Sequence, residues 1–260
     1  MTIPTRAVSL TAQARIPAPS SRIGQQDGSP QRSQPLMRKY EVTHLSSNQT
    51  IENMSQIAPA LPIFETAFAA FARGTLLASP MGPIAIEDLL PGDLLTTRDD
   101  GSLPVQWIGK VKMVPEWQGQ SPEMGKMIRV SADSFGLGRP MPDLLLGSHA
   151  YLLQSGAQVQ ERIGKPQALV SATDLVDWEN VISVTPPTPT DLFHIAFDRH
   201  AIVTANGLEM ESYHPGYAFH NGLSGGMRGL YLSLFPQLEL VSDFGPFLYP
   251  RLEREQVSAA

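Results

Sequence analysis

Short apolar runs alternate with turn signals along the middle of the chain. From about residue 64 to residue 216, these runs are separated by G-P, P-G-D, D-D-G, S-G and N-G. Such dense punctuation predicts short strands joined by tight turns, and therefore an all-β domain. In Pro91-Gly92, proline presets φ for the first central position and glycine takes the positive φ of the second, as a type II turn requires. Residues 94–97 and 105–108 flank Asp100-Gly101 and are predicted to form a hairpin.

The N-terminal part of the chain lacks this pattern. It is rich in Ser, Gln, Pro and Arg, and Tyr40 is its only aromatic residue before Phe64. Such a segment cannot bury enough apolar surface to offset the entropy lost on ordering. We therefore expect a disordered arm over residues 1–60.

The C-terminal part changes character again. Residues 222–229 are rich in glycine, and residues 230–240 are apolar enough to pack as a short helix or strand. The predicted organisation is the arm, a β domain over residues 61–216 and a short C-terminal extension over residues 217–260. Trp107 and Trp178 are expected in the core.

Charge is unevenly distributed between the arm and the rest. The formal net charge is −6, yet residues 1–39 hold six basic residues and one acidic residue, so the remainder carries −11. A basic arm could dock on the acidic body, on a membrane or on nucleic acid, or could remain a solvated tail. The solvated tail is our expectation, with no nucleic-acid partner.

Composition narrows the possible chemistry and location. The chain has no cysteine, which excludes disulfides, thiolate catalysis and cysteine metal sites. No apolar run is long enough to span a membrane, and no secretory signal is recognisable, so a soluble, cytoplasmic protein is the default expectation. The start is rich in Arg and Ser like a transit peptide, but Pro17 and Pro19 would cut short the amphipathic helix which that alternative needs.

Three sequence blocks follow one another along the β domain. The first reads G-T-L-L-A-S-P-M-G-P-I-A-I-E-D-L-L-P-G-D-L-L-T-T-R-D-D-G and is followed by P-V-Q-W-I-G. The second is P-D-L-L-L-G-S-H-A-Y-L-L at 142–153, and the third is F-H-I-A-F-D-R-H-A-I-V-T-A-N-G-L-E-M-E-S-Y-H-P-G at 193–216. Together they resemble the Hint (Hedgehog/intein) domain, most of all its bacterial branch. The resemblance implies a compact, disc-like all-β fold whose two ends meet at a central site.

The resemblance also implies a self-processing reaction. In the family, a Cys or Ser at the first position attacks the preceding carbonyl and converts the amide into a thioester or ester. A histidine of the middle block protonates the departing nitrogen, which suits imidazole because its pKa lies near neutrality. Residues of the closing block assist the second step. The nucleophile position here is Ala70, whose methyl group cannot attack.

Two further departures concern the other blocks. The middle block has Leu146 where the family has a Thr or Ser, three residues before His149. The closing block has Pro215 after its histidine, where a splicing reaction needs an asparagine. Cyclisation of Asn221 or Asn206 stays open, because a following glycine leaves the backbone unhindered. For Asn206 the other interpretation is a tight turn with its glycine.

The candidate catalytic residues carried over by the resemblance are His149, His194, Asp198 and His200. Alternate residues of a strand share a face, so the last three are expected to lie together. They could shuttle protons, bind a metal such as zinc, or form a structural network in which Asp198 pairs with Arg199 or a histidine. We expect neither a metal nor a cofactor, because their six-residue spacing is not a ligand signature.

The predicted function is a Hint-domain protein with a degenerate site, acting as a non-processing scaffold or interaction module on its own polypeptide or on another protein. One alternative is a residual autoproteolytic enzyme that cleaves on the C-terminal side of the domain. Another is a fold retained for a new binding role, in which the acidic body holds a basic partner or the chain's own arm. The sequence carries no signal for an oligomeric state.

Overall fold

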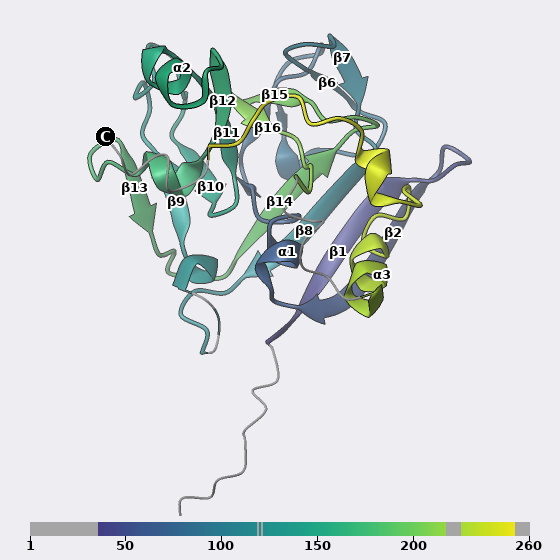
Figure 1. Ribbon diagram of the computed structural model, residues 1–260. Helices are drawn as coiled ribbons and strands as arrows, with labels where there is room; N and C mark the ends of the chain where they lie inside the picture. The colour runs from purple at the N-terminus through teal and green to yellow at the C-terminus, as the bar shows by residue number, and fades with distance from the viewer. Residues whose placement is uncertain (1–35, 119, 121, 217–224, 253–260) are drawn as a thin grey trace, which may run out of the picture. The chain divides into compact units, whose positions relative to one another are not determined.

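Antiparallel strands dominate the chain. The computed structural model describes residues 36–118, 120, 122–216 and 225–252, and within them the strands form three sheets (Figure 1). The largest sheet contains β1 (Met37–Leu45), β2 (Ile51–Pro59), β3 (Phe71–Ala72), β8 (Trp107–Met113), β9 (Met127–Val130), β10 (Leu144–Gly147), β13 (Val181–Val184) and β14 (Thr190–Ala196). The second contains β4 (Leu76–Leu77), β5 (Ile84–Ala85), β11 (Tyr151–Ser155), β12 (Gln167–Ser171), β15 (Ile202–Ala205) and β16 (Leu208–Glu211). The third pairs β6 (Leu94–Thr96) with β7 (Ser102–Pro104).

The strand order brings distant parts of the sequence together. The eight-stranded sheet has the order β13-β9-β10-β3-β14-β8-β1-β2, and the six-stranded sheet has the order β12-β11-β16-β15-β4-β5. The described α-helices are α1 (Pro62–Glu65), α2 (Ala157–Ile163) and α3 (Gly225–Leu232). The prediction of an all-β fold is confirmed. No helix in the described part of the chain is long and apolar enough to cross a membrane.

Each face of the eight-stranded sheet covers an apolar cluster. Along β14, Phe193 and Ile195 point into the cluster shared with the six-stranded sheet, whereas Leu192 and Ala196 point to the opposite side. This alternation is the period-2 geometry of a strand. The opposite side is covered by α1 and α3, which lie in front of β1 and β8 in Figure 1. The sheet is therefore buried on both faces around β14, where the third sequence block begins.

Trp107 anchors the aromatic cluster beneath α3. Its ring stacks on Phe235 with centroids 4.7 Å apart, and its indole N–H donates to the Leu234 carbonyl at 2.8 Å. A Cβ atom at Gly109 would lie 2.2 Å from the Trp107 ring, so the neighbouring strand residue has to be glycine. The prediction that Trp107 belongs to the core is confirmed. For Trp178 the prediction is wrong, because that side chain is 73% exposed.

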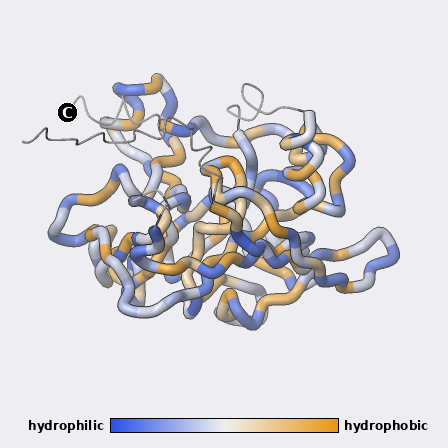
Figure 2. The backbone as a smooth tube through the Cα atoms, turned by 90° about the horizontal axis from the view of Figure 1, so that it is seen from below, coloured by the Kyte–Doolittle hydropathy of each residue, from blue (hydrophilic) through white to orange (hydrophobic). Residues whose placement is uncertain are grey.

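Residues 37–59 correct the expectation of a disordered arm through residue 60. They form the β1–β2 hairpin, and β1 pairs in register with β8 from Tyr40 opposite Val111 to His44 opposite Trp107. The alternating run around Tyr40 is short and lies in a polar segment. The overall composition of that segment therefore predicted disorder instead of a strand. The hairpin tip projects from the sheet in Figure 1 and is mostly hydrophilic in Figure 2. The remainder of the predicted arm, residues 1–35, lies outside the described residues.

Local turn chemistry was predicted well. Gly92 has a φ of +97°, as the Pro91-Gly92 turn requires. A hairpin does form around Asp100-Gly101, but its second strand is β7 (Ser102–Pro104). The predicted second strand, residues 105–108, is wrong, because Trp107 and Ile108 belong to β8 and pair with β1 and β14. Asn206 and Gly207 have φ values of +47° and +89°, the two positive angles of a type I′ turn between β15 and β16.

Replacing Phe235 tests whether the C-terminal extension belongs to the core. Phe235 is completely buried, so we expect Phe235→Ala to lower the free energy of unfolding by about 3–5 kcal/mol. The matched control is Leu240→Ala, at a side chain that is 62% exposed, which should change it by less than about 0.5 kcal/mol. Urea unfolding followed by tryptophan fluorescence measures both. Equal effects from the two variants would contradict this packing.

Candidate functional site

The Ala69–Ala70 peptide lies where the three sequence blocks meet. The Ala70 N–H donates to the carbonyl of Phe193 in β14 at 3.1 Å, and the Ala70 carbonyl accepts from Gly147 N–H in β10 at 2.9 Å. The carbonyl of Ala69 accepts from the backbone N–H of His149 at 3.2 Å. A Cβ atom at Gly147 would lie 2.1 Å from the Ala69 oxygen, so glycine permits this approach. Backbone groups of the second and third blocks thus converge on a buried alanine peptide, where the resemblance places the bond that the family cleaves.

His149 stands beside this peptide but is poorly suited to donate a proton. Its Nε2 is shielded from solvent and has no hydrogen-bond partner among the described residues. Burial lowers the pKa of its ring to about 4, so the imidazole is neutral at neutral pH. Leu146, where the family has a hydroxyl, is fully buried and lies opposite Phe71 and Ile128 in the sheet. No polar side chain from this position can assist the histidine.

His194 belongs to the aromatic side of β14. Its ring meets Phe71 and Tyr213 edge-on, with centroid distances of 5.7 and 5.3 Å. Its Nδ1 accepts from the backbone N–H of Ile195 at 3.1 Å. Burial, followed by the positive charge of Arg251, lowers the pKa of His194 to about 3. The ring is therefore neutral and packed as part of the core.

Asp198 does not join the other candidates. β14 ends at Ala196, so the strand alternation that would place Asp198 beside His194 stops before it. The Asp198 carboxylate is exposed and accepts from Arg199 at 3.1 and 3.0 Å. The prediction of a shared strand face is wrong for Asp198. Its pairing with Arg199 matches the alternative in which Asp198 belongs to a structural network.

His200 and His214 each use both ring nitrogens in hydrogen bonds. In His200, Nδ1 accepts from Leu248 N–H at 3.1 Å, so Nε2 carries the proton that it shares with Glu211 at 3.1 Å. In His214, Nδ1 accepts from Gly216 N–H at 3.0 Å, which leaves Nε2 to donate to the Gly245 carbonyl at 3.1 Å. Neither ring has a free nitrogen for a substrate or a metal.

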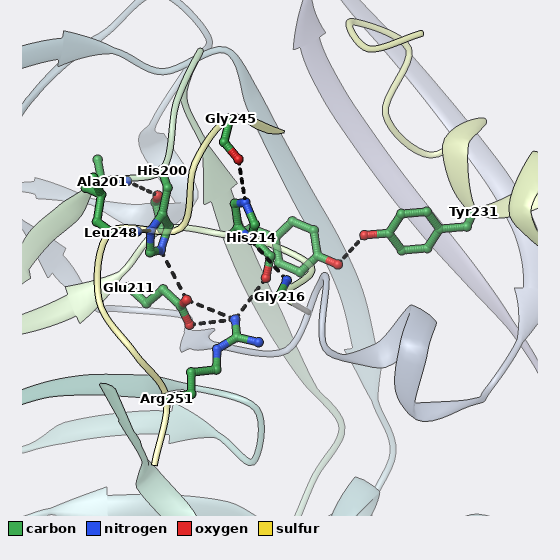
Figure 3. Close-up of polar contacts among 11 residues, drawn as sticks. His200, Ala201, Glu211, His214, Gly216, Tyr231, Gly245, Leu248 and Arg251 are labelled. Atoms are coloured by element: carbon green, nitrogen blue, oxygen red, sulfur yellow. Dashed lines mark hydrogen bonds and ion pairs between the residues drawn. The ribbon is translucent and has the colours of Figure 1, made fainter. Parts of the chain in front are cut away.

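Glu211 and Arg251 form the centre of this polar cluster (Figure 3). The Arg251 Nη2 donates to both carboxylate oxygens of Glu211 at 2.9 Å and to the His214 carbonyl at 2.8 Å. The guanidinium carbon of Arg251 lies 4.4 Å from the ring centroid of Tyr151, a cation–π arrangement. Glu211 is only 2% exposed, so a buried carboxylate holds the chain segment that carries Arg251.

A second polar contact joins the closing block to α3. The hydroxyl of Tyr213 bonds the hydroxyl of Tyr231 inside the aromatic cluster (Figure 3). Burial raises the pKa of both phenols, so both remain protonated. Sequence reasoning missed Tyr213, Glu211 and Arg251 as members of the site. The available signal was a lone arginine in the apolar run F-L-Y-P-R-L, well outside the third block.

The segment that carries Arg251 crosses the whole cluster, and we call residues 245–252 the C-terminal strap. Gly245, Leu248 and Arg251 contact His214, His200 and Glu211 respectively. Arg251 also forms a parallel bridge with Leu169 in β12. Within the described ranges, no three His, Asp or Glu side chains are grouped to hold a metal ion. The polar groups of the third block are thus occupied by the chain itself.

Arg251 provides a direct test of the buried ion pair. Arg251→Met leaves the Glu211 carboxylate buried without its cation, so we expect a loss of about 3–5 kcal/mol in the free energy of unfolding. Arg251→Met combined with Glu211→Gln should recover part of that loss, because the uncompensated charge is removed. The control Arg199→Met, at an exposed pair, should have little effect. Chemical denaturation measures all four proteins, and a double variant that is no more stable than Arg251→Met alone would contradict the pairing.

The neutral histidines predict a loss of stability in mild acid. The pKa values of His149, His194 and His214 are lowered to about 4, 3 and 4, mainly by burial. In the unfolded chain a histidine titrates near 6.5, so below that pH the unfolded state binds protons that the folded state does not. The free energy of unfolding should therefore be greatest above about pH 6.5 and fall towards about pH 4. Urea unfolding at a series of pH values measures this.

His149→Gln isolates one of these contributions. It removes a single titrating ring, so the slope of unfolding free energy against pH should decrease by up to about 1.4 kcal/mol per pH unit. Gln154→Met, at a partly buried residue that does not titrate, should leave the slope unchanged. An unaltered slope in His149→Gln would show that this ring is already protonated when the protein is folded.

Comparison with known proteins identifies the family to which the chain belongs. A family model described as Hint domain matches residues 69–217. No curated protein matches the chain. Among solved structures, the solution structure of a bacterial intein-like domain from Clostridium thermocellum is similar at 12% identity and a TM-score of 0.38, covering 56% of this chain and 99% of that chain. Because the family model spans more than half of the sequence, this chain belongs to the Hint domain family.

Proposed function

We propose that this protein is a Hint-fold scaffold or interaction module that does not process itself. The observation that carries the proposal is that both flanks of the central site are built into the fold. In a self-processing protein, the flanking segment has to leave or be exchanged once its bond is cut. Here the flanks supply strands, core side chains and ion-pair partners to the domain itself.

The flank before Ala70 is held by the eight-stranded sheet. β1 lies between β8 and β2, and it pairs with β2 along its length and with β8 from Tyr40 to His44. Tyr40 and Phe68, from this flank, are fully buried in the aromatic cluster, where their ring centroids are 4.7 Å apart. Breaking the Ala69–Ala70 bond would leave this flank attached through the sheet, so cleavage would release nothing.

The flank after residue 216 is held equally firmly. Tyr231 of α3 is fully buried and bonded to Tyr213, and Arg251 of the strap is bonded to Glu211. In this proposal the described part of the extension, residues 225–252, and the Hint domain of residues 61–216 work as one folding unit. Its partners would be bound by the outer surface rather than consumed at the centre.

The chemistry of the centre supports the same conclusion. Ala70 offers no atom that could form an ester or thioester. Leu146 offers no hydroxyl, and the low pKa of His149 leaves its ring neutral. Three groups that the reaction needs are therefore absent or in the wrong protonation state at one peptide bond.

Residual cleavage on the C-terminal side is the alternative, and Asn206 is one of its two candidates. The Asn206 Oδ1 accepts from Leu76 N–H at 2.8 Å, and its Nδ2 donates to the carbonyls of Pro142 and Asp143 at 3.2 and 3.4 Å. Cyclisation requires Nδ2 to turn and attack the carbonyl of Asn206, which accepts from Met141 N–H at 2.9 Å. The bonds at Oδ1 and Nδ2 hold the side-chain amide in place and oppose this attack. The other candidate, Asn221, lies outside the described residues.

Intact mass under denaturing conditions tests the proposal. The purified full-length chain should keep its mass of 28.3 kDa after long incubation at neutral pH, with and without hydroxylamine. A fragment ending at Ala69, Asn206 or Asn221 would contradict the proposal and support residual autoproteolysis. The same measurement on Asn221→Ala and Asn206→Ala would then assign the bond that is cut.

Ala70→Cys is the matched variant for the first step. We expect it to remain intact as well, because Leu146 and the neutral His149 still fail to activate the peptide. If hydroxylamine cleaves Ala70→Cys while the wild-type chain stays intact, the missing nucleophile alone would account for the absence of self-cleavage. The wild-type prediction would stand in that case.

A further inference from the structure

β2 presents an open edge of the largest sheet. It is the terminal strand after β1 and is nine residues long. No backbone hydrogen bond joins residues 51–58 to any strand other than β1 within the described part of the chain. The opposite edge of the sheet is β13, which is only four residues long. An unpaired edge of this length is a template for another strand.

The hairpin ladder shows which groups of β2 point outward. At its two ends, Ala60 N–H donates to the Leu36 carbonyl at 2.7 Å and Ser46 N–H donates to the Thr50 carbonyl at 2.9 Å. Hydrogen-bonded and non-hydrogen-bonded pairs alternate in an antiparallel ladder. The even-numbered residues of β2 are therefore bonded to β1. The odd-numbered residues 51, 53, 55 and 57 direct their N–H and C=O groups to the free edge.

This edge lacks the features that usually prevent strand addition. Natural edges are commonly protected by lysines, prolines, bulges or short length. β2 has Glu52 as its only charged residue, and its proline is its last residue, Pro59. Two large apolar side chains, Ile51 and Ile57, are 44% and 63% exposed.

We propose that β2 pairs with β2 of a second copy of this chain, so that the eight-stranded sheet continues across a symmetric dimer. The two strands run antiparallel with Met54 opposite the partner's Met54. Such a contact uses the same patch on both subunits and closes after two copies. The inference is independent of whether the chain processes itself.

Side-chain complementarity selects this register. It places Ile51 opposite Ile57, Glu52 opposite Gln56, and Asn53 opposite Ser55, each pair occurring twice by symmetry. Apolar residues meet apolar residues, and the single acidic residue meets an amide rather than its own copy. The outward-facing odd residues also meet odd residues, as shared ladder bonds require.

The position of proline excludes the register centred on Ser55. Centring the pair on Ser55 would place Pro59 opposite Ile51 in a hydrogen-bonded position, where proline has no N–H to donate. Centring it on Met54 places Pro59 opposite Gln49, outside the strand. No ladder bond is then lost.

Ser55→Pro tests the dimer without disturbing the hairpin. The Ser55 N–H points away from β1, so its loss removes only bonds to the second copy, one from each subunit. Size-exclusion chromatography with light scattering should give twice the chain mass for the wild type. Ser55→Pro should weaken dimerisation by about 30-fold or more, corresponding to two lost hydrogen bonds. Ser55→Thr, which keeps the N–H, should remain dimeric, and circular dichroism should show both variants folded.

Engineered cysteines test the register, because the chain has none of its own. Opposed residues in a non-hydrogen-bonded pair have Cα atoms about 4.5 Å apart, within the range of a disulfide. Met54→Cys should therefore form a covalent dimer under mild oxidation, whereas Ser55→Cys should not. A wild type that stays monomeric at high concentration would overturn the proposal. Cross-linking of Ser55→Cys instead of Met54→Cys would overturn the register.

Discussion

The buried contact between Glu211 and Arg251 is the interaction on which the arrangement of the closing block depends. A carboxylate that is 2% exposed is costly unless its charge and its lone pairs are satisfied. Arg251 supplies the charge and two bonds, and His200 supplies a third. Arg251 lies 40 residues after Glu211, so the buried third sequence block depends on the strap for its counter-charge. The C-terminal strap is therefore part of the structure that stabilises the third sequence block.

The aromatic cluster extends this dependence to the other flank. Tyr213, next to the ion pair in sequence, bonds Tyr231 of α3, and its ring stacks on Phe235 at 5.3 Å. Phe235 stacks in turn on Trp107 of β8, the strand that pairs with β1. Packed aromatic pairs of this kind stabilise the fold by more than the burial of their apolar area alone. The segment before Ala70, the third sequence block and the segment after residue 224 thus pack into one core. The side chains of the candidate site are therefore packed together and do not line an open cleft.

Sequence reasoning succeeded where the determinant was local and failed where it was distant. The Pro91-Gly92 and Asn206-Gly207 turns were predictable because each needs only the φ preference of its own residues. β1 and β2 were missed because their stability comes from β8, more than 50 residues away, and from a short alternating pattern in a polar segment. Asp198 was misplaced because nothing in its own side chain signals that β14 ends at Ala196. The family blocks identified segments that meet around the Ala69–Ala70 peptide. The pairing of Arg251 with Glu211 was missed, because the two residues lie 40 positions apart in the sequence.

The side chains of the candidate site differ in how well packing accounts for them. Ala70 and Leu146 are apolar groups in apolar surroundings, so their presence favours folding. His200 and His214 have partners for every ring nitrogen, so their polarity is compensated. His149 is different: it buries Nε2 without a partner, which costs on the order of 1–3 kcal/mol, and burial lowers its pKa by disfavouring the charged form. Packing alone would favour an apolar residue there, so His149 is the candidate-site residue whose presence the fold does not explain.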